Sequence, residues 1–291
     1  FLLWSESEYG CLGTGVFVHN TRRAAKMAIL NIDHGDILEF IRCKADEEKK
    51  IRALKDAGFD MSLSGKDILS VQFQNANNSV RISDAFMKAV EEDGTWDLIA
   101  TTDGSVLETV KARELWAEIA KAAWECADPG VQFDTTIEDW NTTPKYKLHG
   151  SNPCSEHTRR NYSSCNLASV NLVKFINSDG TFDFKKYASV CSLVLIAQDI
   201  LICESTAPTP QIREVTLSDR DLGLGVMGLG ATLLRLGMPY DSAAGRTFAA
   251  ALQGILTGAG YSASSAMASK VGMAPIFAEE DGLNLEGVRA V

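Results

Sequence analysis

The sequence predicts an α/β fold, because segments with helical periodicity alternate with short apolar segments of strand length. Composition supports a globular domain of this class. Of the 291 residues, 45% are hydrophobic and 23% are charged, which is enough apolar material for one large core or two smaller ones. No internal repeat or low-complexity linker interrupts the pattern, so these segments are expected to pack together.

Each expected element follows from its periodicity and its boundary residues. The clearest amphipathic helix covers residues 110–127 and ends before Asp-Pro-Gly, and Ser83 or Asp84 is a typical cap for a helix over 85–93. Further helices are expected over residues 36–58, 184–205, 221–237 and 242–271. Strands are expected over residues 67–73, 96–102 and 165–175. The polar stretch from Gln74 to Ser79 is expected outside the core, and residues 141–164 are expected to be irregular, since turn-forming residues dominate them.

Charge and cysteine content exclude several classes of protein. A net charge of −10 and a pI near 5.0 argue against a nucleic-acid surface, which needs clustered basic residues. The longest apolar run, residues 191–203, is short for a bilayer, and no signal peptide is visible. Seven cysteines without a C-x-x-C pair indicate thiols in a reducing compartment. We therefore expect a cytoplasmic protein with no membrane or direct nucleic-acid partner.

Chemistry-bearing residues gather in the least regular segment, "SNPCSEHTRRNYSSCNLASVNL". Asn152 and Glu156 each lie two residues from Cys154, so in an extended or looped backbone an amide, a thiol and a carboxylate can face one substrate. Cys165 follows 11 residues after Cys154, far enough for a second thiol to return to the same pocket. A buried structural cysteine is the simpler alternative. A zinc site on Cys154, His157 and Cys165 is disfavoured by the spacing and by the lack of an evident fourth ligand.

Five sequence blocks resemble one family in order along the chain. "NPCSE" followed by "CNLASVNL" resembles the active-site loop of ribonucleotide reductase large chains. Similar blocks of that family are "TRRAAKMAILNIDHGDILEFIRCK", "QNANNSVRISDAFMKAV", "DPGVQFDTTIEDWNT" and "DLGLGVMGLGATLLRLGMPYDS". The sequence of these blocks is most similar to that of the adenosylcobalamin-dependent class II enzymes. The resemblance implies part of a ten-stranded α/β barrel, with the radical cysteine on a central loop.

The resemblance also implies a role for each chemistry-bearing residue. Cys154 would carry the thiyl radical that removes the 3′ hydrogen of a ribonucleotide, and Glu156 would be the general base on the 3′ hydroxyl. Asn152 would hydrogen-bond the ribose. Cys165 would be half of the dithiol that is oxidised as the 2′ hydroxyl leaves as water, and a thioredoxin-like or other dithiol reductant would restore it. The cofactor implied is adenosylcobalamin.

Regulation and assembly are implied in less detail. The polar stretch that includes Gln74, Asn75, Asn77, Asn78 and Ser79 falls where the family has a loop that links the specificity effector site to the substrate base. A solvated turn is the alternative for this stretch. The resemblance implies dNTP or ATP effectors, a ribonucleoside di- or triphosphate substrate, and a homodimer when the chain is complete.

Two other functions are alternatives to a class II reductase. The rivals are a class I reductase with a di-metal radical subunit, and a non-catalytic nucleotide-binding regulator of the same fold.

"GLGVMG", residues 223–228, matches the dinucleotide-binding pattern G-x-G-x-x-G. However, no apolar strand precedes it, as that fingerprint requires. In the family resemblance this block is a helix of the barrel.

The sequence changes in character after residue 20. "GTGVFVHN" followed by Thr21 resembles the C-terminal splice junction of an intein, with Asn20 as the cyclising residue, His19 as its helper and Thr21 as the hydroxyl nucleophile. Residues 1–20 would then be an intein remnant, and residues 21–291 part of a reductase catalytic barrel. The alternative is a divergent strand and turn. The redox partner of Cys165 and the phosphate-binding segment are expected outside the chain, so we expect the fragment to be inactive alone.

Overall fold

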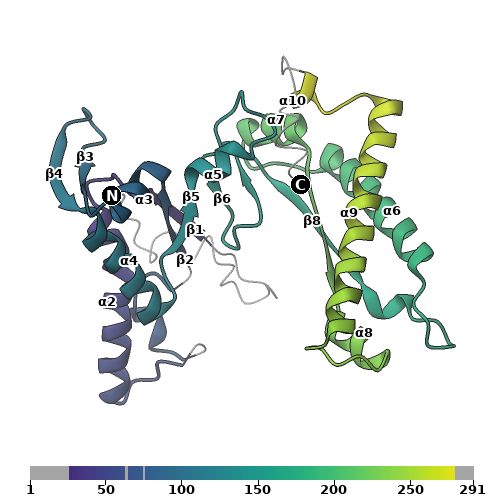
Figure 1. The fold of residues 1–291 in the computed structure, drawn as a ribbon, viewed down its shortest axis with the longest axis horizontal. Coiled ribbons are helices and arrows are strands. Elements are labelled where there is room, and N and C mark those ends of the chain that lie inside the picture. The colour runs from purple at the N-terminus through teal and green to yellow at the C-terminus, as the bar shows by residue number, and fades with distance from the viewer. Residues whose placement is uncertain (1–25, 63–64, 75, 279–291) are drawn as a thin grey trace. The chain divides into compact units, whose positions relative to one another are not determined.

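The computed structural model describes residues 26–62, 65–74 and 76–278, which divide into two compact units, 26–159 and 160–278 (Figure 1). Each unit combines helices with a parallel sheet, so the α/β prediction is confirmed. No closed barrel forms among the described residues. His19, Asn20, Thr21 and Asn75 lie outside them.

The first unit is built on a parallel sheet of three strands in the order β1-β2-β5. These are β1 (Lys26–Asn31), β2 (Ala76–Ile82) and β5 (Gly130–Phe133). The helices of the unit are α2 (Ile37–Asp56), α3 (Asp84–Glu91), α4 (Ala112–Cys126) and the short α5 (Asp134–Asp139). The unit also contains an antiparallel hairpin of β3 (Thr95–Ile99) and β4 (Val106–Lys111), a 3₁₀ turn η1 at Ile68–Ser70, and a second short hairpin near its end.

The two faces of β2 have different partners. Val80 and Ile82 are fully buried in a core with apolar residues of α2, α3 and α4, and the Asn78 amide on the same face donates to Cys43 Sγ on α2. Asn77 and Arg81 lie on the opposite face, where Asn77 donates to Pro153 O and Arg81 donates to Leu148 O and pairs with Asp134. Because side chains alternate along a strand, β2 packs a helical layer on one face and supports a polar segment on the other.

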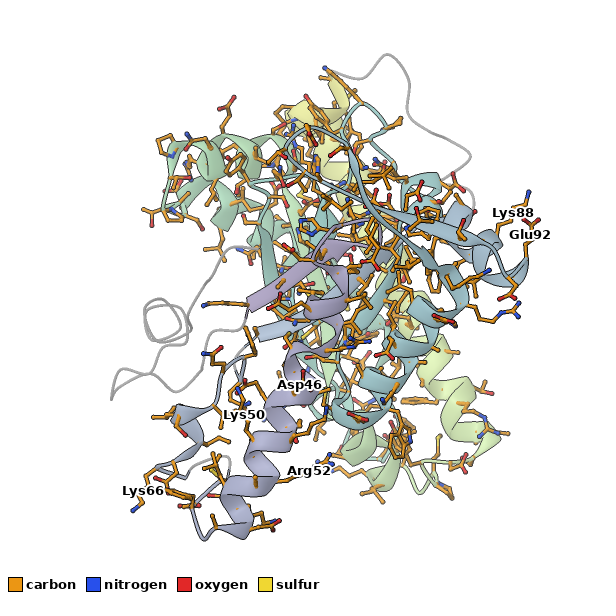
Figure 2. The ribbon with its side chains drawn as sticks, turned by 90° about the vertical axis from the view of Figure 1, so that its left-hand side faces the viewer. Asp46, Lys50, Arg52, Lys66, Lys88 and Glu92 are labelled. Atoms are coloured by element: carbon orange, nitrogen blue, oxygen red, sulfur yellow. The ribbon has the colours of Figure 1, made fainter. Side chains whose placement is uncertain are left out.

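Helix α2 presents a charged surface on the side away from this core. Figure 2 shows Asp46, Lys50 and Arg52 on this helix, and Lys88 beside Glu92 at the end of α3. Lys49 pairs with Asp46, and Lys88 pairs with Glu92 at 3.8 Å. Exposed pairs of this kind contribute at most about 0.5 kcal/mol each, so burial of the apolar face holds the helix in place.

The second unit has a parallel pair of strands, β8 (Cys165–Asn171) and β9 (Asp221–Met227). The long helices α6 (Phe184–Glu204) and α9 (Ala243–Val271) pack against each other, and α6 also contacts both strands. The shorter elements are η2 (Leu172–Phe175), α7 (Pro210–Asp219), α8 (Leu229–Arg235) and α10 (Pro275–Ala278). Its core includes the fully buried Tyr187 of α6, whose ring meets Phe175 and Phe182 edge-on.

The expected helices over 36–58, 85–93, 110–127, 184–205 and 242–271 are confirmed, as are strands within 96–102 and 165–175. Ser83 caps α3 by accepting from the backbone N–H of Phe86. Sequence patterns missed β1, β4, β5 and α7. Strand β1, with the sequence KMAILN, has no clean alternation of polar and apolar residues. Strand β5 is only four residues long, which is too short to show one.

Two predictions of secondary structure are wrong. The expected strand over 67–73 is the 3₁₀ turn η1 and a loop, and the strand lies instead at β2, where the polar Asn78 and Ser79 are buried. Hydrogen bonding to neighbours makes this burial tolerable. The expected helix over 221–237 is strand β9 followed by α8. Glycines at alternate positions in β9 suit close strand packing rather than a helix.

Helix α6 is long and apolar enough to qualify as a membrane span by length and composition, which the sequence patterns did not anticipate. This is weak evidence for a membrane protein, because core helices pass the same test. Its contacts with α9, β8 and β9 account for part of its apolar surface.

Candidate active site

Cys154 lies at the tip of a short antiparallel hairpin in the first unit. The strands are β6 (Gly150–Ser151) and β7 (Thr158–Arg159), and the backbone N–H of Asn152 extends the pairing by donating to His157 O at 3.1 Å. Ser155 N donates to Asn152 O at 3.0 Å, which closes a β-turn with Pro153 and Cys154 as its central residues. Proline presets the φ angle that the first central position needs. The tip is therefore a turn and not the extended backbone expected.

Asn152 and Glu156 meet across this turn. The Asn152 side chain and the backbone N–H of Glu156 itself donate to the Glu156 carboxylate, and together they hold its pKa below the ordinary value. The Asn152 Oδ1 atom accepts from His157 N at 3.1 Å, which fixes the amide orientation. The geometry thus supplies an ionised carboxylate, which is the form that a general base requires.

Cys154 itself is exposed and carries a thiol. It occupies the position of the turn between Asn152 and Glu156, and Ser155 beside it has a positive φ of 63°. A left-handed residue directly after Cys154 reverses the chain so that Glu156 returns toward Asn152. The predicted grouping of Asn152, Cys154 and Glu156 on one loop therefore agrees with the structure, although by a different backbone geometry.

The polar face of the sheet supports this hairpin at several points. The buried Arg81 guanidinium donates to Leu148 O and pairs with Asp134. Gln132 of β5, next to Arg81 in the strand register, donates from Nε2 to Ser151 Oγ at 2.7 Å. Asn77 of β2 donates to Pro153 O at 3.0 Å. Sequence patterns missed Arg81, Gln132 and Ser151 as site residues. The only available signal was the alternation of Ser79 and Arg81 with the apolar Val80 and Ile82.

Cys165 begins strand β8 in the second unit. Its partner in the strand register is Asp221, and its Sγ lies 3.8 Å from Asn166 O. A methyl group added at Gly223 of β9 would lie 3.2 Å from Cys165 Sγ and 2.5 Å from Leu167 Cδ2. Gly223 therefore leaves the room that the thiol occupies. This glycine belongs to the segment that matches G-x-G-x-x-G.

Buried Gln198 of α6 fixes the two strands beside Cys165. Its Nε2 donates to Asn166 O at 2.8 Å and to Gly223 O at 2.9 Å. The side chain is 2% exposed, so water does not compete for these bonds. The amide joins β8 and β9 next to the thiol.

The residues predicted to form an effector loop have a mixed placement. Asn77, Asn78 and Ser79 lie in strand β2, and Asn78 and Ser79 are buried there, so the expectation of a loop is wrong for these three. Gln74 precedes the strand, and its Nε2 donates to Gln72 O at 3.2 Å.

Within the part of the chain that the structure describes, no group of three or more Cys, His, Asp and Glu residues could hold a metal ion.

Comparison with known proteins identifies the family. Residues 16–286 match the family described as "Ribonucleotide reductase, barrel domain". The chain is 52% identical over 257 residues to a protein of Streptomyces avermitilis named "Vitamin B12-dependent ribonucleotide reductase", covering 87% of this chain and 27% of that protein. A relative of the same name from Streptomyces coelicolor is 51% identical over 257 residues, with the same coverage.

A more distant relative gives a similar result. The "Vitamin B12-dependent ribonucleoside-diphosphate reductase" of Mycobacterium tuberculosis is 32% identical over 280 residues, covering 96% of this chain and 37% of that protein. The chain spans about a quarter of the length of the Streptomyces relatives. The family match and the parallel α/β units agree with one another. The chain belongs to the ribonucleotide reductase barrel-domain family.

Proposed function

We propose that this chain supplies the radical site of an enzyme that reduces ribonucleotides to 2′-deoxyribonucleotides. The observation that carries the proposal is the turn at residues 152–156, where an exposed thiol lies between an amide and a carboxylate that hydrogen-bond each other. Family membership over residues 16–286 supports assigning reductase chemistry to that turn.

The proposed reaction is balanced in atoms and electrons. The Cys154 thiyl takes the 3′ hydrogen atom, which leaves a carbon radical on the ribose, and the Glu156 carboxylate takes the 3′ hydroxyl proton. The 2′ hydroxyl leaves as water. Cys165 and a second thiol supply two electrons and two protons and become a disulfide. The hydrogen held on Cys154 then returns to C3′ and Glu156 returns its proton to the 3′ oxygen, so the net change is ribonucleotide plus dithiol to deoxyribonucleotide, water and disulfide.

Adenosylcobalamin is the proposed radical source, since the relatives are named vitamin B12-dependent. When bound, the cofactor supplies the unpaired electron that reaches Cys154. An exposed cysteine on a hairpin tip fits this requirement, because a bulky group must approach the sulfur closely. Cys154 is the residue of this chain that would meet the cofactor. These names favour class II over a class I reductase or a non-catalytic regulator.

Further partners belong to the same proposal. The substrate is a ribonucleoside di- or triphosphate, and dNTP or ATP effectors set which base is reduced. A thioredoxin-like or other dithiol resets the disulfide, and the complete enzyme is a cytoplasmic homodimer. Family membership supports a nucleotide substrate and nucleotide effectors.

The test uses the complete protein that contains this chain, supplied with adenosylcobalamin, a dithiol and each ribonucleotide. Cys154→Ala is expected to abolish deoxyribonucleotide formation, a loss of at least about 10⁴-fold, because no other group can carry the radical. Nucleotide binding, measured by calorimetry, is expected to persist. Cys203→Ala, an exposed cysteine of the second unit, serves as the control. Reduction by the Cys154→Ala enzyme would overturn the assignment.

We also propose that the Asn20–Thr21 bond is a splice junction, on the sequence His19-Asn20-Thr21 and the change of sequence there. The family match begins at residue 16, five residues before Thr21, so the exact boundary rests on the junction chemistry. Mass spectrometry of the mature product of the whole gene tests this. Loss of residues 1–20 is expected, and Asn20→Ala should block it. A mature protein that keeps residues 1–20 would contradict the junction.

A further inference from the structure

Two consecutive carbonyl groups just before Cys154 are held by side chains. Asn152 O accepts from Ser151 Oγ at 3.0 Å, and Pro153 O accepts from Asn77 Nδ2 at 3.0 Å. These carbonyls belong to the two peptide units that lead into Cys154. Fixing both planes restricts the direction in which the Cys154 side chain leaves the backbone.

Gln132 contacts Ser151, the donor of the first of these bonds. Its Nε2 lies 2.7 Å from Ser151 Oγ. Ser151 has a single hydroxyl hydrogen, which faces Asn152 O at 3.0 Å and Ser155 Oγ at 3.3 Å, so Gln132 must be the donor in its bond with Ser151. The order of donation therefore runs from Gln132 through Ser151 to the backbone of the cysteine turn.

The burial of Gln132 is costly and calls for an explanation. Its side chain is 6% exposed, and its Oε1 has no hydrogen-bond partner among the described residues. An unsatisfied buried oxygen destabilises a fold, and an apolar residue of the same size avoids that penalty. Gln132 neighbours Arg81 in the strand register, and the Arg81 side chain already holds Leu148 O. Gln132 is thus not needed to attach the hairpin to the sheet.

We propose that Gln132, acting through Ser151, and Asn77 are positioning residues that aim the Cys154 thiol. The proposal deepens the proposed function and rests on it for its catalytic readout. The two amides come from adjacent parallel strands, so the sheet provides a rigid reference for the turn. Radical transfer depends steeply on the position of the reacting atoms, so loosening the turn slows the reaction without affecting nucleotide affinity.

The experiment compares three variants of the complete protein: Gln132→Met, Ser151→Ala and Asn77→Ala. Gln132→Met removes the unpartnered Oε1 and keeps the side-chain volume, so the melting temperature is expected to stay level or rise. Each variant is expected to lower kcat by about 10-fold or more with KM within about twofold, because binding groups are untouched. Gln253→Met, the same change on an exposed site of α9, is expected to leave kcat unaltered.

A second readout does not depend on turnover. Iodoacetamide labelling followed by mass spectrometry gives the alkylation rate of Cys154, with exposed Cys203 in the same sample as an internal standard. Because the turn is less restrained, the ratio of the Cys154 rate to the Cys203 rate is expected to change by at least about twofold in the variants.

The outcomes separate the two proposals. If kcat falls, KM holds, the melting temperature does not fall and the alkylation ratio changes, the positioning role is supported. The positioning role is overturned if both kcat and the alkylation ratio match wild type. It is also overturned if Gln132→Met lowers the melting temperature while Ser151→Ala and Asn77→Ala leave kcat unchanged. If the wild-type protein reduces no ribonucleotide, the proposed function fails, and the alkylation ratio alone decides the positioning role.

Discussion

The hairpin that carries Cys154 and the strand that carries Cys165 hold their thiols in different ways. Cys154 lies in a turn at an exposed tip, and side chains from β2 and β5 hold the backbone around it. Cys165 lies in a strand, where the ladder with β9 fixes its backbone and Gln198 ties the two strands together. Each region uses one buried glutamine whose Oε1 has no partner among the described residues.

The difference matches the proposed chemistry of the two thiols. A cysteine that must meet a bulky cofactor and then a ribose needs open surroundings, and a turn at a tip provides them. A cysteine that only delivers electrons needs a fixed place near its partner thiol, and a strand provides that. Side-chain contacts can aim an exposed residue, whereas a backbone ladder holds a residue with little further help.

The largest expected effect sharpens the role of the hairpin. Glu156→Gln keeps the size of the side chain and removes the carboxylate that would accept the 3′ hydroxyl proton. Loss of a general base lowers kcat by about 10² to 10⁴-fold. Steady-state assays of the complete protein measure this, with Glu204→Gln at the exposed end of α6 as the control. A Glu156→Gln enzyme with wild-type kcat would rule out the base assignment.

A smaller effect concerns the pH dependence. Hydrogen bonds from its own N–H and from Asn152 lower the pKa of Glu156, so the carboxylate stays ionised until the pH falls below its ordinary pKa. Activity that needs this carboxylate is therefore lost only at low pH. Asn152→Ala removes one of the two donors, so the pKa rises and the loss begins at higher pH. The acid limb of kcat/KM against pH measures the shift, and an acid limb that stays in place would contradict the geometry.

Another variant tests the strand that carries Cys165. Gly223→Ala places a methyl group against Cys165 Sγ and Leu167 Cδ2, and Leu167 is exposed and able to move. The free energy of unfolding is expected to change by less than about 1 kcal/mol, since crowding and the gain from replacing glycine oppose each other. Alkylation of Cys165 is expected to slow because the methyl group shields the sulfur. Gly225→Ala is the control, since its methyl group meets only Ser169 Oγ at 3.8 Å.

A further comparison concerns thiols outside the site. Burial raises the pKa of Cys43 to about 11, because the thiolate is poorly solvated there. At pH 8 Cys43 is therefore almost wholly protonated and should react with iodoacetamide far more slowly than exposed Cys203. The rate for Cys43 should rise steeply above pH 10. Equal rates for Cys43 and Cys203 at pH 8 would contradict the partial burial of Cys43 on α2 beside Asn78 of β2.

Long helices with polar and apolar faces could be predicted from the sequence, and so could the segment that bears the chemistry. The periodicity of residues 110–127 reflects a helix with one buried face, and Asn152, Cys154 and Glu156 stand together in an irregular segment. The strands were harder to predict from the sequence. The buried positions of β2 include Asn78, Ser79 and Arg81, whose polarity suggests a loop until their partners in space are known.

The supporting residues could not be predicted because their partners are distant in the chain. Asn77 and Pro153 are 76 residues apart, and Gln132 binds Ser151 from another strand. The glycines of β9 illustrate the same limit. Their spacing resembles a helix-packing pattern, and only the pairing of β9 with β8 shows that Gly223 makes room for Cys165.

One measurement tests most directly the claim that the two thiols divide the work. The complete protein is given adenosylcobalamin and a ribonucleotide with tritium at C3′, and release of tritium is followed in wild type, Cys154→Ser and Cys165→Ser. Tritium release is expected in Cys165→Ser, because removal of the 3′ hydrogen needs only Cys154 and the tritium on the stalled, exposed Cys154 sulfur can exchange with water. Less release is expected in wild type, because the hydrogen held on Cys154 returns to C3′ in each turnover. No release is expected from Cys154→Ser. Release from Cys154→Ser would contradict the account, and so would its complete loss in Cys165→Ser.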